Sequence, residues 1–337
     1  MKAIGYWKAG VLDRADALLD LEVPLPEPGA LDLRVKVAAF AVNPVDIKIR
    51  QSRNPTGSAP EILGWDAVGL VDAMGGSVEG FELGDRVYYA GAIDRPGSNA
   101  EYHLVDARIV GHAPRSVSDA QAAALPLTAI TAWELLFDRL QVTQGGEHGK
   151  VLLVVGAAGG VGSILVQLAR QLTALTIVGT ASRPESQAWV RELGAHYVID
   201  HRQAFAGQLS AIGFSEVDFI ASLTSTDQHW KSIVQAIRPQ GRISLIDDPV
   251  QPLDIMPLKR KCASLHWEFM FARSLHQTPD IARQGEILNR VAALVDGGRV
   301  RSTLTRSLRP ISAARLREAH RVLESSQAIG KIVLEGF

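Results

Sequence analysis

One segment of the chain, residues 151–170, restricts the possible folds more than any other. It reads VLLVVGAAGGVGSILVQLAR: an apolar, β-branched run, then a turn of small residues, then an amphipathic run. The pattern predicts a strand over 151–155 and a helix over 162–171, joined by a tight turn. The turn and its junction with the helix hold Gly156, Ala158, Gly159, Gly160, Val161 and Gly162.

A turn of this kind binds the pyrophosphate of a dinucleotide. Its backbone N–H groups approach the phosphates closely, and the helix N-terminus adds a partial positive charge. Glycine spacing alone is a weak signal, but here a strand precedes it and a helix follows it, as the motif requires. We therefore predict a dinucleotide site at 156–162 rather than an ordinary glycine-rich turn.

The end of the next expected strand, 175–180, indicates which dinucleotide binds. NAD sites place an acidic residue there to hold the ribose 2′-hydroxyl. Here no Asp or Glu occurs until Glu185, and Ser182 and Arg183 come first. A hydroxyl and a guanidinium match a 2′-phosphate, which favours NADP(H) over NAD(H). The alternative is a helix-capping serine beside a solvated arginine.

The rest of the chain shows two different sequence patterns, which divide near residue 125. Up to about residue 124, short strands such as 33–39, 67–71 and 87–89 alternate with Pro and Gly signals, which is typical of a partly open antiparallel β-domain. From residue 126, strands alternate with helices, which predicts an α/β fold with a parallel, doubly wound sheet. The expected strands are 151–155, 175–180, 197–200, 217–223, 242–247 and 265–269, and the expected helices are 162–171, 185–193 and 227–237.

After about residue 270 the pattern predicts helices over 280–296 and 313–324 and a last strand over 330–334. We expect this tail to return to the N-terminal domain. The predicted domains are therefore 125–269, which binds the dinucleotide, and a β-domain for substrate and catalysis built from 1–124 and 270–337.

Composition excludes several classes of protein. The chain has 35 basic and 36 acidic residues, so its charge gives no reason to expect nucleic acid or an anionic membrane as partner. No run approaches the length of a membrane span, and the N-terminus lacks the apolar core of a secretory signal. The single cysteine, Cys262, excludes an intrachain disulfide and suits a reducing compartment. We expect a cytoplasmic protein.

Several short segments, read together, point to a family. They are VNPVD (42–46), ILGWD (62–66), GDRV (84–87), ALPLTAITA (124–132), GAAGGVG (156–162), LGA (193–195) and GKIVL (330–334). They resemble the medium-chain dehydrogenase/reductase superfamily, in its quinone oxidoreductase-like branch. The segments at 95–106, 131–140 and 220–230 resemble the group named zinc-type alcohol dehydrogenase-like.

The resemblance covers essentially the whole chain and implies a GroES-like β-domain beside a Rossmann domain, with the active site in the cleft between them. Relatives associate through the edge of the Rossmann sheet, so we expect a homodimer, with an unpaired sixth strand as a suitable edge. Trp267, Phe269 and Phe271 share one face of that strand by their spacing of two, and either line the cleft or pack an interface.

Zinc members of the superfamily carry an early cysteine, a later His-Glu pair and a four-cysteine lobe. This chain has Val42-Asn43-Pro44 at the first place and Trp65-Asp66 at the second, and the lobe is missing. Catalytic zinc needs about three protein ligands, and the nine histidines show no paired metal spacing. We therefore expect no tightly bound zinc and assign no residue to a metal.

Without a metal, oxidation of a simple alcohol loses its main electrophile. Quinones and α,β-unsaturated carbonyls remain suitable substrates, because the charge that hydride brings spreads onto a remote oxygen. Metal-free family members reduce such compounds with NADPH, which is the activity that the resemblance implies. Two alternatives stay open: a zinc-dependent alcohol dehydrogenase with unrecognised ligands, and a sensor that binds NADPH with little turnover.

Five residues are candidates for the catalytic pocket. Asn43 is placed to donate to a substrate oxygen and Asp46 to hold a water, although Asn-Pro followed by Asp is also ordinary turn chemistry. Lys48 is either a proton donor or a solvated lysine. Trp65 is either a pocket wall or a core residue. Tyr89 offers a phenol donor, and since Tyr88 points to the opposite face, at most one of the two faces the cleft.

Four further residues complete the expected cofactor site. The resemblance places Thr128 near the nicotinamide, with a cap of a helix beginning near Thr131 as the alternative. His201 lies where relatives carry a tyrosine near the adenosine phosphate, and is otherwise simply exposed. Leu223 and Thr224 end the fourth strand of the parallel sheet, at whose carboxyl edge ligands bind.

Overall fold

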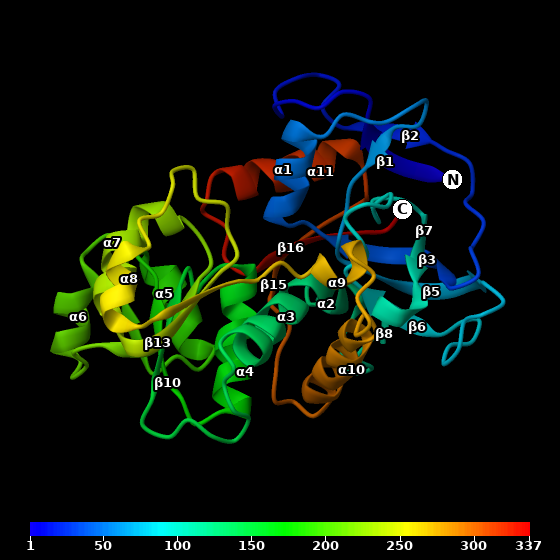
Figure 1. Cartoon of the computed structure of the whole chain (residues 1–337). Helices are drawn as coiled ribbons and strands as arrows, with labels where there is room; N and C mark the ends of the chain where they lie inside the picture. Colours follow the sequence, from blue (N-terminus) through cyan, green and yellow to red (C-terminus); the bar gives the residue numbers. More distant parts are fainter. The chain divides into compact units, whose positions relative to one another are not determined.

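The computed structural model describes residues 1–337. The chain divides into two compact units (Figure 1). Unit 1 contains Met1–Ile130 and Phe271–Phe337, and unit 2 contains Thr131–Met270. Each unit is built around its own sheet.

Unit 2 contains a six-stranded parallel sheet with the strand order β11-β10-β9-β12-β13-β14. Its strands are β9 (Val151–Val155), β10 (Thr176–Thr180), β11 (Tyr197–Ile199), β12 (Val217–Ser222), β13 (Ile237–Leu245) and β14 (Ser264–Trp267). The chain runs outward from β9 to β11 and then returns to β12 on the other side of β9. This reversal is the topological switch point of a doubly wound fold, at which ligands bind. The predicted fold class is confirmed.

One helix of unit 2 precedes β9, and the other five alternate with the strands along the chain (Figure 1). They are the π-helix η2 (Glu134–Arg139), α4 (Gly160–Leu172), α5 (Pro184–Glu192), α6 (Phe205–Ala211), α7 (Thr226–Ala236) and α8 (Met256–Lys261). All five residues of β9 are buried, as expected for a strand covered on both faces of its sheet. The amphipathic helix α4 buries Ile164, Leu165 and Leu168.

Unit 1 contains a three-stranded sheet, β2-β1-β4, and a seven-stranded sheet with the path β15-β16-β3-β5-β6-β8, where β7 also pairs with β3. The strands are β1 (Lys2–Tyr6), β2 (Leu19–Glu22), β3 (Asp32–Ala41), β4 (Glu61–Ile62), β5 (Ala67–Met74), β6 (Arg86–Tyr89), β7 (Tyr102–Asp106), β8 (Gly111–His112), β15 (Leu304–Leu308) and β16 (Lys331–Glu335). The C-terminal strand β16 lies antiparallel to β3, which brings Lys331 close to the loop that follows β3.

The helices of unit 1 are α1 (Pro44–Ser52), the short 3-10 helix η1 (Ala107–Ile109), α2 (Asp119–Ala123), α9 (Ala272–Leu275), α10 (Arg283–Asp296) and α11 (Ala313–Glu324). The boundary between the units falls within α3 (Pro126–Trp133). The helix α11 begins and ends at the predicted residues.

Three local predictions are wrong. The helix expected to begin near Thr131 begins at Pro126, because proline is well suited to a first helical position; Thr128 and Thr131 are therefore not caps. The strand expected over 265–269, with Phe271 on the same face as Trp267 and Phe269, ends at Trp267. Trp267 and Phe269 are 55% and 47% exposed, whereas Phe271 is 3% exposed, so the three do not share one face.

The third wrong prediction concerns the length of an apolar helical stretch. The consecutive helices from Asp119 to Arg139 form a stretch that is long and apolar enough to cross a membrane, contrary to the expectation from the sequence. Within the structure 89% of its most apolar window is buried. Burial of this extent is the pattern of a helix packed in a protein core.

Candidate functional site

The predicted dinucleotide turn of unit 2 is tightly built. Gly156 has a φ of 83°, a conformation that L side chains rarely adopt. A Cβ atom at Gly156 would lie 2.8 Å from Cγ2 of Thr224, and one at Gly162 would lie 2.4 Å from the carbonyl oxygen of Gly156. Both positions therefore require glycine, as the motif predicts.

The N-terminus of α4 is suited to an anion. Gly159 is the N-cap and supplies no side chain, and the first turn of the helix carries no acidic residue. A Cβ atom at Gly159 would meet nothing closer than the Gly156 carbonyl oxygen at 3.5 Å, so the turn is open there. Unpaired N–H groups and the helix dipole favour a phosphate at such a place. This turn fits a dinucleotide pyrophosphate.

Thr180, at the end of β10, fixes the turn, and the sequence analysis missed it. Its hydroxyl accepts a hydrogen bond from the Gly156 N–H at 3.0 Å, and its side chain is buried. The contact joins the ends of two neighbouring strands. Thr180 could have been recognised from the sequence, because it is a threonine at the end of the second strand of a predicted nucleotide-binding fold.

The ends of β10 and β11 gather two arginines around Ser182. Arg183 is the N-cap of α5, and its backbone N–H donates to Ser186 Oγ at 3.2 Å, so the capping position is Arg183 and not Ser182. Arg202 donates from Nη2 to the Ser182 carbonyl oxygen at 3.1 Å. Asp200 holds Arg202 with contacts of 3.0 Å to Nε and 2.6 Å to Nη2.

Arg202 is thus a second cation beside the predicted 2′-phosphate position, and the sequence analysis missed it. The sequence did carry a sign of Arg202, namely the Asp-x-Arg spacing after β11, because Asp200 orients the Arg202 side chain. The Arg202 side chain remains 66% exposed and so stays accessible to a ligand.

The other predicted cofactor residues of unit 2 lie at the same edge of the sheet. Leu223 follows β12, and its N–H donates to the Val155 carbonyl oxygen at 3.1 Å. Thr224 lies against Gly156. His201 follows β11, is half-buried, and has its ring centroid 5.8 Å from that of His229; burial lowers the pKa of His201.

Thr128 lies in unit 1. It is buried, and its hydroxyl donates to the Leu125 carbonyl oxygen at 3.1 Å.

Unit 1 contains a buried polar cluster of Asn43, Asp46, Asp66 and Lys331, all 3% exposed or less. The Lys331 ammonium donates to Asp66 Oδ2 at 2.8 Å, to the Val42 carbonyl oxygen at 2.9 Å and to Asn43 Oδ1. Asn43 Nδ2 donates to Asp66 Oδ2 at 2.9 Å. The Asn43 amide is therefore held at both ends.

The carboxyl groups of the cluster are capped by backbone N–H groups. Asp66 Oδ1 accepts from the Leu127 N–H at 2.7 Å, and Asp46 Oδ2 accepts from the Asn43 N–H at 2.7 Å. The second contact belongs to a capping box at the start of α1. Burial raises the pKa of Asp46 to about 7, against the lowering effect of the Asn43 N–H and of Lys331. Burial also raises the pKa of Asp66.

The other three predicted catalytic residues lie outside this cluster. Trp65 is 1% exposed and donates from Nε1 to the Ala92 carbonyl oxygen at 3.1 Å. The Tyr89 hydroxyl lies 3.1 Å from Nδ1 of the buried His103, and their rings stack. Tyr88 is equally buried. Lys48 is exposed on α1. The structure thus brings Asn43 and Asp46 together but not Lys48 or Tyr89.

Sequence reasoning missed two members of the cluster as site residues, Asp66, which was considered only as a zinc ligand, and Lys331. Its segment GKIVL was recognised only as a family signal, and its neighbours in the cluster are more than 260 positions away along the chain. A lysine inside an apolar strand was the available sign, because a buried lysine needs a partner.

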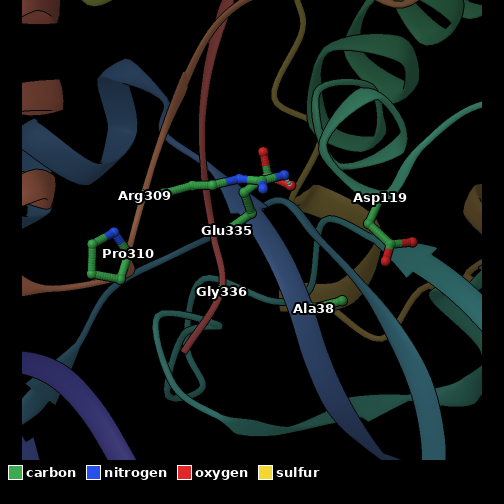
Figure 2. A pocket seen from close by; sticks show the side chains of 6 residues that line it. All are labelled: Ala38, Asp119, Arg309, Pro310, Glu335 and Gly336. Atoms are coloured by element: carbon green, nitrogen blue, oxygen red, sulfur yellow. Dashed lines mark ion pairs between the residues drawn. The ribbon is translucent and has the colours of Figure 1, made fainter.

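Unit 1 also carries a surface hollow of about 490 Å³ (Figure 2). It is lined by Ala38, Asp119, Arg309, Pro310, Glu335 and Gly336. Figure 2 shows Arg309 extending toward Glu335, with an ion pair of 2.6 Å between them. None of the predicted site residues lines this hollow, so it is not part of the candidate site.

Comparison with known proteins agrees with this architecture. Residues 29–115 match the alcohol dehydrogenase GroES-like domain, and residues 193–334 match the zinc-binding dehydrogenase family. A zinc-type alcohol dehydrogenase-like protein of Staphylococcus aureus is 38% identical over 336 residues, which is 99% of each chain. The chain belongs to the medium-chain dehydrogenase/reductase superfamily. A Rhizobium etli protein described as a zinc-dependent alcohol dehydrogenase has 52% identity and a TM-score of 0.97, covering 100% of this chain and 98% of that one.

This dehydrogenase/reductase belongs to the quinone oxidoreductase-like branch, and two of its more distant relatives are named as oxidoreductases. A chloroplastic NADPH-dependent alkenal/one oxidoreductase of Arabidopsis thaliana is 28% identical, covering 99% of this chain and 79% of the relative. The quinone oxidoreductase of Coxiella burnetii has 28% identity and a TM-score of 0.82 over 100% of this chain and 99% of its own. A mycobacterial protein in complex with NADPH has 26% identity and a TM-score of 0.83 over 99% of both.

The zinc in the names of several relatives does not fit the residues of this dehydrogenase/reductase. Catalytic zinc needs about three protein ligands and an open position. The structure places no three His, Cys, Asp or Glu side chains where they could hold a metal ion. Both oxygens of Asp66 already accept hydrogen bonds, so zinc there would have to displace a buried ammonium. We derive no step through zinc.

Proposed function

We propose that this protein is an NADPH-dependent, zinc-independent reductase that transfers hydride to quinones or α,β-unsaturated carbonyl compounds. The observation that carries the cofactor proposal is the grouping of Ser182, Arg183 and Arg202 at the ends of β10 and β11. No acidic residue ends β10, where NAD sites carry one. Two relatives support it, since one is named for NADPH and another was solved with NADPH.

In this proposal the reduced nicotinamide, when bound, supplies the hydride, and the chain binds and orients both reactants. The turn at 156–162 holds the pyrophosphate through backbone N–H groups and the N-terminus of α4. Arg183 and Arg202 form charge-assisted hydrogen bonds with the 2′-phosphate. Thr128, His201, Leu223 and Thr224 are proposed to complete the cofactor site.

We assign substrate orientation to Asn43. A primary amide has two N–H groups, of which one binds Asp66, so the other is proposed to donate to the substrate oxygen on which charge develops. Lys331 and Asp66 would keep that amide in one orientation. Asp46 positions Asn43 through its backbone N–H. Trp65 and Tyr89 are proposed as walls of the pocket, and Lys48 as a source of the final proton.

The edge strand β14 is the proposed contact in a homodimer. It pairs only with β13, and Trp267 and Phe269 at its end are about half-exposed. Large apolar side chains beside an open strand edge favour association. Light scattering after size-exclusion chromatography tests this, and a monomer at micromolar concentration contradicts it. The cytoplasmic location stays a prediction.

The decisive assay follows the loss of NADPH absorbance with a benzoquinone, an enone, an enal and a simple ketone, with NADH in parallel and with and without a chelator. Turnover of the first three with NADPH preferred, unaffected by the chelator, supports the proposal. Turnover of the ketone alone, abolished by the chelator, refutes it in favour of a zinc enzyme. Tight NADPH binding without turnover refutes it in favour of a sensor.

A further inference from the structure

In unit 2, a short turn of Leu223, Thr224 and Ser225 joins β12 to α7 at the carboxyl edge of the parallel sheet. Ser225 has a φ of 50° and a ψ of 40°, the left-handed conformation that residues other than glycine rarely adopt. Such a conformation persists only where the surrounding structure fixes it. Ser225 is the N-cap of α7, but its side chain makes no capping hydrogen bond. The contacts that fix the turn therefore come from elsewhere.

Asp247, in the loop that follows β13, supplies the acceptor that the start of α7 lacks. The N–H of Thr226, the first residue of α7, donates to Asp247 Oδ2 at 2.8 Å, and the Thr226 hydroxyl donates to Asp247 Oδ1. The first N–H groups of a helix have no partner within the helix, and a carboxylate suits the positive end of its dipole. Asp247 thus holds both the backbone and the side chain of the first helical residue.

The hydrogen bonds continue from Thr226 to the end of β12. Ser222 Oγ lies 2.7 Å from Thr226 Oγ1, and both residues are 0% exposed. Because an ionised carboxylate only accepts hydrogen bonds, the Thr226 hydroxyl donates to Asp247 and accepts from the Ser222 hydroxyl. These three side chains form one directed chain of hydrogen bonds. Since Ser222 precedes the turn and Thr226 follows it, the chain fixes both ends of residues 223–225.

The 223–225 turn lies against the proposed pyrophosphate site. Ser222 is paired with Val155, the residue before Gly156. The next residue, Leu223, donates its N–H to the Val155 carbonyl oxygen at 3.1 Å. Thr224 then occupies the space beside Gly156, where a Cβ atom would lie 2.8 Å from the Thr224 Cγ2 atom. A change in the conformation of the turn would therefore be felt at the place where the dinucleotide is proposed to bind.

We propose that Asp247 is a positioning residue of the cofactor site, which acts through Thr226 and Ser222 to hold the 223–225 turn in the conformation that accepts the dinucleotide. The inference rests on the dinucleotide site of the proposed function, but not on which dinucleotide or which substrate is used. Without Asp247, Ser225 would relax from the left-handed region, and binding would have to restore it. The dissociation constant then rises by the reciprocal of the fraction of molecules that keep the competent turn.

The first test is a fluorescence titration of the full-length protein with NADPH and with NADH. We expect Asp247→Ala to raise both dissociation constants by the same factor, since the turn borders the pyrophosphate that the two dinucleotides share. The factor is about 5–30-fold, which corresponds to the cost of one left-handed residue. The control Asp227→Asn removes an equal charge from the first turn of α7 but lies outside the chain of hydrogen bonds, and it should leave both constants unchanged.

Two further pairs of variants keep the test valid if Asp247→Ala fails to fold. Thr226→Val keeps the shape of the side chain but removes its hydroxyl, so it should weaken both dinucleotides, whereas Thr226→Ser keeps the hydroxyl and should bind like the wild type. Glycine adopts the left-handed conformation without the cost. The double variant Ser225→Gly/Asp247→Ala should therefore recover part of the affinity that Asp247→Ala loses.

Kinetics and hydrogen exchange separate positioning from general destabilisation. Bound cofactor itself holds the turn, so Asp247→Ala should raise the KM for NADPH and leave the kcat for a benzoquinone at saturating NADPH near that of the wild type. In the ligand-free protein, the Leu223 N–H should exchange faster in Asp247→Ala than in Asp227→Asn.

Unchanged dissociation constants in Asp247→Ala, or a loss of kcat without a rise in KM, would overturn the positioning role. Preference for NADH, with equal losses for both dinucleotides in Asp247→Ala, would support the positioning role and refute only the NADPH assignment. If the wild type binds neither dinucleotide, this inference and the proposed function are both refuted.

Discussion

Replacing Lys331 with methionine tests the buried polar cluster of unit 1. The substitution removes the only cation of the cluster and leaves Asp66 charged, 0% exposed, with hydrogen bonds from Leu127 and Asn43 alone. Removing one partner of a buried ion pair costs about 3–5 kcal/mol. The ammonium also donates to the Val42 carbonyl oxygen, so we expect a loss of at least about 3 kcal/mol in the free energy of unfolding.

The measurement is the unfolding temperature without ligand. For a unit of this size, 1 kcal/mol corresponds to about 2–4 °C, so Lys331→Met should unfold about 6–20 °C lower than the wild type. Lys36→Met, at an exposed position of β3, is the control and should change little. The double variant Asp66→Asn/Lys331→Met removes both charges and should recover part of the loss. A single variant within 1 kcal/mol of wild type, or a double variant no better than the single one, would refute the ion pair as a stabilising unit.

Three further predictions concern other parts of the chain. Arg183→Ala and Arg202→Ala should each weaken NADPH binding about 10–100-fold, since a charged hydrogen bond contributes about 1.5–3 kcal/mol; equal losses for NADH in a titration would contradict the 2′-phosphate assignment. Gly162→Ala, whose Cβ would lie 2.4 Å from the Gly156 carbonyl oxygen, should destabilise unit 2, whereas Gly207→Ala in α6, which meets nothing within 4 Å, should stabilise it by about 0.5–1 kcal/mol in denaturant unfolding. Burial lowers the pKa of His320 to about 3, so the folded state keeps it neutral and stability is lost as pH falls below its unfolded value of about 6.5. His320→Phe should therefore lose less stability than wild type between pH 7.5 and 4.5, and equal losses would exclude His320 as the cause.

Most of the parallel sheet could be predicted, because each strand is marked by its own local pattern of apolar residues. Residues 151–155 are apolar without interruption, and a strand with both faces buried requires that pattern. The turn at 156–162 is contiguous, so its cofactor residues are visible in the sequence. Helix 313–324 was predictable to the residue, because its apolar stripe is regular and Ser312 caps it.

The polar contacts could not be predicted, because they depend on register between distant segments. Lys331 meets Asp66 only once β16 has paired with β3. Arg202 reaches Ser182 only because β10 and β11 are neighbours in the sheet. The π-helix gave no signal either, since its sequence has an ordinary helical composition. It was the i→i+5 winding that placed Arg139 beside Glu134.

The buried polar cluster of unit 1 leads to a last prediction. Unit 1 buries Asp46 and Asp66 around the ammonium of Lys331. This cluster has two carboxyl groups and one permanent cation, so it is neutral only if it keeps one proton. Since burial raises the pKa of Asp46 to about 7, Asp46 is the expected proton carrier in unit 1.

Folding should therefore take up protons, and stability should fall as pH rises between the ordinary carboxyl pKa near 4 and a value near 7. The limiting slope for one proton is about 1.4 kcal/mol per pH unit. Buried histidines act with the opposite sign below about pH 6.5, so the informative quantity is the difference between wild type and Asp46→Asn. That difference should grow in favour of the variant as pH rises from 5 to 7 and then stay constant. A difference independent of pH would mean that Asp46 is ionised in the folded state, with the charge of Lys331 spread over both carboxylates.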